Sequence, residues 1–198
     1  MLASRDVPLV EDDMYGDLHF GFDRPKAAKA FDANGLVLTC GSFSKSLAPG
    51  WRVGWLAPGR FQRDIERLKM TSTLATATPL QLAVAEFMAH GGYERTLRVQ
   101  RKAHARAVDE LARAVVRHFP PGTGVSSPEG GFVVWVRMPE RVDSIALYGQ
   151  ALKAGIMIAP GPMFSPRGRF RNFVRLNAGA WTPDLDRTIA TLGRLARA

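Results

Sequence analysis

The stretch from residue 36 to residue 55 places the strongest constraint on how this chain can fold. An apolar run, LVLTC at residues 36–40, leads directly into GSFSKSLAPGWRVGW at residues 41–55. A short apolar run bounded by turn residues is typical of a buried strand in an α/β sheet. VPLVEDD, at residues 7–13, has the same form and ends in acids. Two buried strands with polar C-terminal ends are therefore predicted, and ligands of open α/β sheets bind outside such ends.

Further strands and helices are expected along both parts of the chain. In the first part we predict a strand over residues 52–57 and helices over Phe61–Met70, Pro79–His90 and Tyr93 to about His118. After residue 120 the pattern changes to strands over residues 130–139, 156–161 and 173–179. Two more helices are expected there, one capped by Asp143 with Ile145, Tyr148 and Leu152 on one face, and one opened by Thr182 and Pro183.

This order of elements indicates two domains of different character. Residues 1–92 are predicted to form part of a large α/β domain, residues 93–118 a connecting helix, and residues 119–198 a small α+β domain. A cleft is expected where such units meet.

Composition and charge narrow the classes of protein to which this chain can belong. The 198 residues are 46% hydrophobic, enough for a sizeable core, yet no apolar run could cross a bilayer and the N-terminus does not resemble a signal peptide. A cytoplasmic protein is expected, and its single cysteine, Cys40, excludes an internal disulfide. The net charge of +9 has two interpretations, a nucleic-acid patch or a solvated helix face. We favour the second because no nucleic-acid-binding motif accompanies the charge.

The polar residues at the predicted strand ends suggest a cofactor site. If the strands are neighbours, a carboxylate, a phenol, two hydroxyls, an amine and a guanidinium converge, from Asp12, Tyr15, Ser42, Ser44, Lys45 and Arg52. Pyridoxal 5'-phosphate requires this set: an amine for its aldehyde, an acid for its ring nitrogen, and hydroxyls and a guanidinium for its phosphate. The alternatives are a surface lysine in a turn and an acid that caps a turn.

Arg175 is the other candidate, because it interrupts the apolar run FVRLN. A charged side chain on an apolar strand usually has a partner, which here would be a ligand carboxylate or a structural ion pair. The four histidines lack metal-ligand spacing, so no metal is assigned.

Several segments resemble a known family. EDDMYGDL, GSFSKSLAPGWRVGW and FVRLNAG resemble the class I/II aminotransferases, which are fold-type I pyridoxal-phosphate proteins. GGYERTLRVQRKAHAR, EGGFVVWVRMP and AGIMIAPGPMFS resemble more narrowly the aminotransferase-like half of MocR-type regulators of the GntR family. The resemblance covers essentially the whole chain. It implies an α/β fold, the C-terminal part of an aspartate-aminotransferase-like transferase with a partial large domain and a small α+β domain.

The resemblance also assigns a role to each candidate residue. Lys45 would form the aldimine with pyridoxal 5'-phosphate, Asp12 would pair with the ring nitrogen, and Tyr15 would bind the ring's phenolic oxygen. Ser42, Ser44 and Arg52 would line the phosphate. Arg175 would bind the α-carboxylate of the substrate.

The function implied by the resemblance is to transaminate or to sense an amino acid. Amino acids and 2-oxo acids would be the small-molecule partners, a homodimer is expected, and DNA would be bound only through an N-terminal domain outside this chain. The alternative is a stand-alone aminotransferase, or its truncated and inactive remnant. The glycine-rich loop, the ring-stacking aromatic residue and the NPTG-like asparagine of the family are not found here, which predicts a fragment or a shortened reading frame. Whether the protein is an enzyme or a sensor is left open, as is its substrate.

Overall fold

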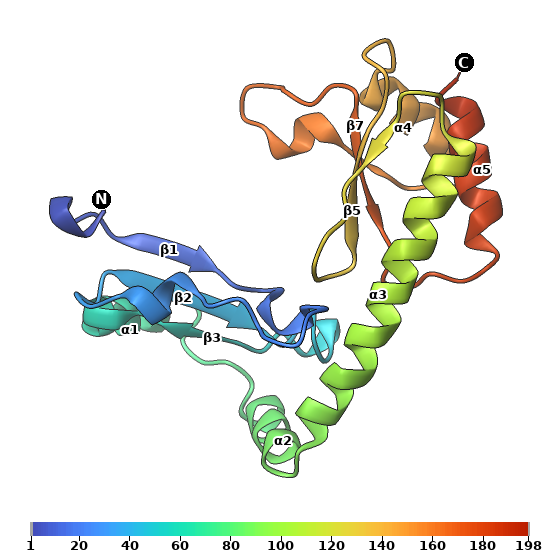
Figure 1. The fold of residues 1–198 in the computed structure, drawn as a ribbon. Helices are drawn as coiled ribbons and strands as arrows, with labels where there is room; N and C mark the ends of the chain where they lie inside the picture. The colour runs from blue at the N-terminus through green and yellow to red at the C-terminus, as the bar shows by residue number, and fades with distance from the viewer. Residues whose placement is uncertain (1, 198) are drawn as a thin grey trace. The chain divides into compact units, whose positions relative to one another are not determined.

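The computed structural model of this protein describes residues 2–197, which divide into two compact units (Figure 1). The first unit ends at Arg101 and the second begins at Lys102. The predicted boundaries at residues 92 and 118 stay a prediction, while the long helix expected between them is present.

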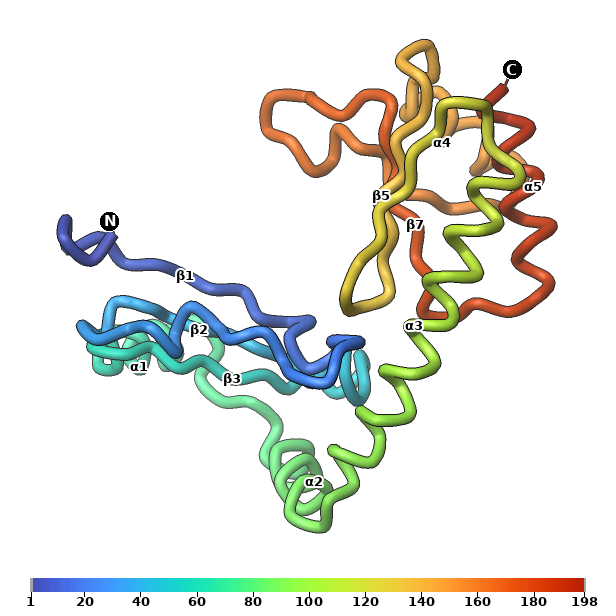
Figure 2. Tube along the Cα trace, viewed as in Figure 1, coloured from blue at the N-terminus to red at the C-terminus, as the bar shows by residue number. Residues whose placement is uncertain are grey.

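The first unit combines a small sheet with helices that follow it in sequence. Its strands and α-helices are β1 (Leu9–Asp12), β2 (Val37–Ser42), β3 (Gly54–Ala57), α1 (Gln62–Ser72), α2 (Thr78–Ala89) and the start of α3 (Gly92–His118). The strands and helices predicted for this region are confirmed, with ends that differ by one to a few residues. Figure 2 traces the long connection from β1 to β2, which contains the short 3-10 helices η2 (Gly16–Leu18) and η3 (Ala28–Phe31).

The sheet of the first unit has the order β1-β2-β3. β1 runs parallel to β2 with Asp12 opposite Cys40, and β3 runs antiparallel to β2 with Gly54 opposite Ser42. Alternate residues of β2 are buried, among them Val37 and Thr39, as expected where successive side chains point to opposite faces. The C-terminal ends of β1 and β2 therefore lie at the same edge of the sheet, where β3 begins.

The second unit is an antiparallel sheet with helices against one face. Its elements, besides the rest of α3, are β4 (Gly124–Val125), β5 (Val133–Arg137), α4 (Ser144–Lys153), β6 (Ala159–Pro160), β7 (Phe173–Asn177) and α5 (Leu185–Leu195). The strand order is β4-β5-β7-β6. These elements confirm the predicted small α+β part of the chain.

The core of the second unit lies between the sheet and its helices. Val134, Val136 and Val174 are fully buried on the sheet, and Leu111 of α3 and Leu192 of α5 are buried as well. Figure 1 shows α3 and α5 on the same side of the sheet. Full burial of a side chain of this size stabilises the fold by about 1.5 to 3 kcal/mol, so this layer holds the unit together.

Helix α4 begins as the sequence predicts, but it buries a different face from the one we named. The Asp143 carboxylate accepts hydrogen bonds from the backbone N–H groups of Ile145 and Ala146, which confirms the cap. Ile145 and Leu152 are about half exposed, whereas Leu147 and Ala151 are buried. The apolar residues surround much of this short helix, so their spacing alone does not identify the packed side.

Over residues 2–197, the helices are too short or too polar to cross a bilayer.

Candidate functional site

The predicted cofactor residues of the first unit follow the ends of its strands. Asp12 is the last residue of β1 and Ser42 the last residue of β2, its parallel neighbour. Ser44 and Lys45 lie in the turn that follows β2, and Arg52 stands two residues before β3. Parallel strands end at the same edge of a sheet, so the topology gathers these residues there.

Asp12 and Tyr15 both come from the chain that leaves β1. The carboxylate of Asp12 is exposed, and it makes no hydrogen bond or ion pair within residues 2–197. Tyr15 precedes η2 and is 36% exposed. Asp12 is therefore open to a ligand. The phenol of Tyr15 follows it three residues later on the same segment of chain.

The hydroxyl of Ser42 shapes the loop that carries the lysine. Its Oγ donates to the carbonyl of Val53 at 3.2 Å and accepts from the backbone N–H of Ser44 at 3.0 Å. The N–H of Phe43 also donates to the Val53 carbonyl, at 3.1 Å. These bonds tie the chain after β2 to the chain before β3.

Lys45 and Arg52 are the exposed cations of this edge. In the described part of the chain, Lys45 Nζ has no hydrogen-bond or ion-pair partner, and the same holds for the Arg52 guanidinium. Arg52 has a φ of 55°, in the left-handed region, after the short helix η4 (Pro49–Trp51). That conformation costs a residue other than glycine about 1 kcal/mol or more, and such strain is often found at functional positions.

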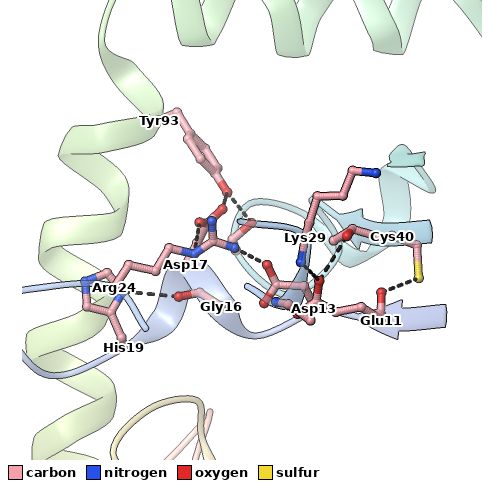
Figure 3. Close-up of polar contacts among 12 residues, drawn as sticks. Glu11, Asp13, Gly16, Asp17, His19, Arg24, Lys29, Cys40 and Tyr93 are labelled. Atoms are coloured by element: carbon pink, nitrogen blue, oxygen red, sulfur yellow. Dashed lines mark hydrogen bonds and ion pairs between the residues drawn. The ribbon is translucent and has the colours of Figure 1, made fainter. Parts of the chain in front are cut away.

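A network of polar side chains supports this edge, and the sequence analysis did not identify it (Figure 3). The Tyr93 hydroxyl at the start of α3 lies 2.8 Å from Asp17 Oδ2 and 2.8 Å from Ser46 Oγ. Arg24 pairs with Asp13 and also approaches Asp17, with Nε 3.4 Å from Oδ1. No fixed spacing links these residues, so the only sequence signal was the neighbourhood of Tyr15 and Lys45.

Burial changes the acidity of two members of this network. Burial raises the pKa of Tyr93 to about 12, and its bond to the Asp17 carboxylate acts in the same direction. Burial also raises the pKa of Asp13, although the neighbouring Arg24 guanidinium opposes the change. Tyr93 is therefore protonated, and able to donate, throughout the neutral range.

Glu11 has a structural role. Its carboxylate accepts from the backbone N–H of Ala28 at 2.5 Å and of Lys29 at 3.2 Å, and from Thr39 Oγ1 at 2.9 Å. These bonds, the one to Ala28 first, lower the pKa of Glu11. They attach η3 to β1 and β2.

Arg175 lies on β7 of the second unit, opposite Trp135 of β5. Its guanidinium stacks over the Phe164 ring at 4.6 Å, and within residues 2–197 it has no acidic partner. The Trp135 ring contacts Phe164, Phe170 and Phe173, at centroid distances of 5.4 to 5.7 Å. An arginine held by an aromatic face, with no carboxylate beside it, leaves its N–H groups for a ligand.

The fold and the family are established by comparison with known proteins. The model of the family "Aminotransferase class I and II" matches residues 1–192, so the chain belongs to this family. This confirms the family and the α/β fold class predicted from the sequence.

Among similar proteins are both regulators and enzymes. The uncharacterized HTH-type transcriptional regulator YdcR of Escherichia coli is 38% identical over 98% of this chain, and YjiR of the same organism is 37% identical over 89%. The kynurenine aminotransferase of Pyrococcus horikoshii, solved in a complex with PMP, has a TM-score of 0.91 and 31% identity over 99% of this chain. The chain spans 42% and 38% of the two regulators and 49% of the enzyme.

Another solved structure has a ligand bound. LysN, the α-aminoadipate aminotransferase of Thermus thermophilus, is complexed with N-(5'-phosphopyridoxyl)-L-leucine. It has a TM-score of 0.88 and 28% identity, and the match covers 100% of this chain and 52% of LysN.

Proposed function

We propose that the C-terminal edge of the β1-β2-β3 sheet binds pyridoxal 5'-phosphate, with Lys45 as the residue that bonds to its aldehyde. The observation that carries this proposal is the free amine of Lys45. It is exposed, without a partner in residues 2–197, on a loop braced by Ser42 at the end of a strand whose parallel neighbour ends in Asp12. A lysine in an ordinary turn needs no such neighbours.

The other groups at this edge fit the remaining parts of the cofactor. The Asp12 carboxylate would keep a proton on the ring nitrogen, and the Tyr15 phenol would donate to the ring oxygen. Ser42, Ser44 and Arg52 would hold the phosphate, for which hydroxyls and a guanidinium are suitable donors. When bound, the cofactor supplies an electron sink for the charge that develops at the substrate Cα.

Residues of the chain itself would transfer the proton and bind the substrate. Lys45 Nζ is the base that would take the proton from the substrate Cα and return it. Arg175 would bind the α-carboxylate through two parallel hydrogen bonds, and the Phe164 ring would keep its guanidinium plane in place. Amino acids and 2-oxo acids are the substrate class that this pair of residues supports.

We favour a sensor half of a transcriptional regulator as the role of this site. The support is the likeness to YdcR at 38% and YjiR at 37% identity, since the regulators' remaining length would contain their DNA-binding part. In such a protein, an amino acid that reacts at the cofactor would shift the balance between two conformations. A homodimer that binds DNA through a domain outside this chain would be the working form.

A stand-alone aminotransferase is the second candidate. It is supported by the aromatic-amino-acid aminotransferase 1 of Thermococcus litoralis, 33% identical over 89% of this chain, and by the enzyme structures described above. Net conversion of an amino acid and a second 2-oxo acid over many turnovers would favour the enzyme. A single, stoichiometric reaction with no turnover would favour the sensor.

The test is a titration of the folded protein with pyridoxal 5'-phosphate, followed by borohydride reduction and peptide mapping. We expect a visible absorption band and a reduced adduct on Lys45. Lys45→Ala should abolish the adduct, whereas Lys69→Ala, which removes an exposed lysine from α1, should leave it unchanged. Folded protein that yields no adduct, or an adduct that survives in Lys45→Ala, would overturn the proposal.

A further inference from the structure

A buried pair of hydroxyls includes that of Ser46, the residue that follows the proposed cofactor lysine. Tyr93 is 6% exposed and Ser46 is 2% exposed, and their oxygens are 2.8 Å apart. The Tyr93 oxygen is equally close to Asp17 Oδ2, at 2.8 Å. A phenol has one proton and a carboxylate can only accept, so Tyr93 donates to Asp17 and accepts from the Ser46 hydroxyl.

Both partners of Tyr93 adjoin residues of the proposed site. Ser46 follows Lys45 directly, and Asp17 is two residues beyond Tyr15. One hydroxyl on helix α3 therefore connects the loop after β2 to the loop after β1. Fixing both loops from a helix restricts the positions that Lys45 and Tyr15 can take.

Further contacts hold the residues around Tyr93. The backbone carbonyl of Asp17 accepts from Arg101 Nε at 2.7 Å, and Arg24 pairs with the Asp17 carboxylate. The Phe43 ring meets the Tyr93 ring edge to face, with centroids 5.6 Å apart. Because Tyr93 stays protonated at neutral pH, its hydroxyl can donate to the Asp17 carboxylate there.

Gly16 lies in the same network of polar side chains. A Cβ at this position would lie 2.1 Å from Asp13 Oδ1 and 2.5 Å from Arg24 Nη2, so a side chain here would displace the ends of the two side chains that form the ion pair. The segment that carries Tyr15 is thus held from two sides, by the Asp13–Arg24 pair and by Tyr93 through Asp17.

We propose that Tyr93 is a positioning residue for the cofactor lysine, acting through Ser46 to hold the loop that carries Lys45 and through Asp17 to hold the loop that carries Tyr15. It touches neither cofactor nor substrate. The inference rests on the proposed function, because it concerns the geometry of the same site. A purely structural tyrosine would stabilise the fold and leave the properties of the bound cofactor unchanged.

The test compares Tyr93→Phe with Tyr148→Phe, which removes a phenol from α4 of the second unit. Tyr93→Phe keeps the ring and its contact with Phe43 while removing the hydroxyl. We expect about a tenfold loss of affinity for pyridoxal 5'-phosphate, the size of effect that one buried hydrogen bond produces. The pH midpoint of the cofactor's absorption band should also shift, and the fraction trapped on Lys45 at limiting cofactor should fall. Tyr148→Phe should match the wild type in all three.

Ser46→Ala provides a second route to the same loss. If Tyr93 acts through Ser46, the two substitutions remove the same interaction. The fold loss of cofactor affinity in the double variant Tyr93→Phe/Ser46→Ala should then be smaller than the product of the two single losses. Fully multiplicative effects would overturn the coupling.

The outcomes separate this inference from the proposed function. If the wild type traps cofactor on Lys45 and folded Tyr93→Phe has the same affinity and the same pH midpoint, the positioning role is wrong and the cofactor site stands. A variant with a lower melting temperature but unchanged cofactor properties leads to the same conclusion. If folded wild type traps no cofactor, both proposals fail.

Discussion

Gly161 begins the segment before β7 that contains Phe164 and Phe170, and the Phe164 ring packs on Arg175. A side chain at Gly161 would not fit there, so Gly161→Ala should be strongly destabilising. Gly161 begins the short helix η6 (Gly161–Phe164). A Cβ on Gly161 would lie 2.1 Å from the carbonyl oxygen of Phe170 and 2.9 Å from that of Phe173. Both are backbone atoms, so neither can move away by a side-chain rotation.

The size of the effect follows from these distances. Ordinary Cβ contacts begin near 3.4 Å, so the Phe170 carbonyl would have to move by more than an ångström. Overpacking of this kind costs about 1 to 3 kcal/mol, and loss of the Phe164 and Phe170 contacts with Trp135 would add up to about 1 kcal/mol each. We expect a loss of about 2 to 4 kcal/mol in the free energy of unfolding.

Gly149→Ala is the matched control. Gly149 lies inside α4 of the same unit, and a Cβ there would meet nothing within 4 Å. Alanine is the better helix former, so this change should stabilise the protein by about 0.5 to 1 kcal/mol. Urea unfolding followed by circular dichroism gives both values. A Gly161→Ala protein within about 0.5 kcal/mol of the wild type would refute the steric argument.

Three further predictions concern the two proposed ligand sites and the α4 cap. Asp12→Asn should still bind the cofactor but lose most Cα proton exchange, measured by deuterium incorporation into an amino acid; unchanged exchange would contradict the role of Asp12. Arg175→Lys keeps the charge but loses the planar fork, so the amino-acid concentration that changes the cofactor spectrum should rise more than tenfold with trapping on Lys45 unaffected; an unchanged concentration would count against the clamp. Arg171 and the N–H groups of Ala146 and Ile145 lower the pKa of Asp143. Its contribution is therefore complete above its unfolded pKa and is lost as the pH falls through the folded value, so the roughly 1 kcal/mol deficit of Asp143→Ala in urea unfolding at pH 6 should shrink below about pH 4. A deficit that is constant with pH would exclude this linkage.

Much of the candidate site could be predicted because its signals are local. Ser42, Ser44, Lys45 and Arg52 lie within eleven consecutive residues, and Asp12 ends a short apolar run with an obvious strand pattern. The residue types and their spacing along one strand and its loop do not depend on how the rest of the chain packs. The topology adds that these runs are parallel neighbours, which the sequence analysis had to assume.

The supporting network could not be predicted, because its partners are distant in sequence. Tyr93 is 47 residues from Ser46 and 76 from Asp17, and no motif connects them. The sequence around Ser46 does not distinguish it from a serine that only shapes a turn. Its burial and its partner depend on where the start of α3 packs against the loop.

The sequence by itself determined the family, the alternation of strands and helices, and the reactive residue types, because these follow from local pattern and from chemistry that each side chain carries wherever it lies. Only the tertiary structure decided that Leu147 rather than Ile145 faces the core, that Arg175 stacks on Phe164, and that Tyr93 joins the loops of Lys45 and Tyr15. Each of these depends on side chains brought together by packing between separate elements. Burial and hydrogen-bond partners are properties of that packing, and a linear pattern does not contain them.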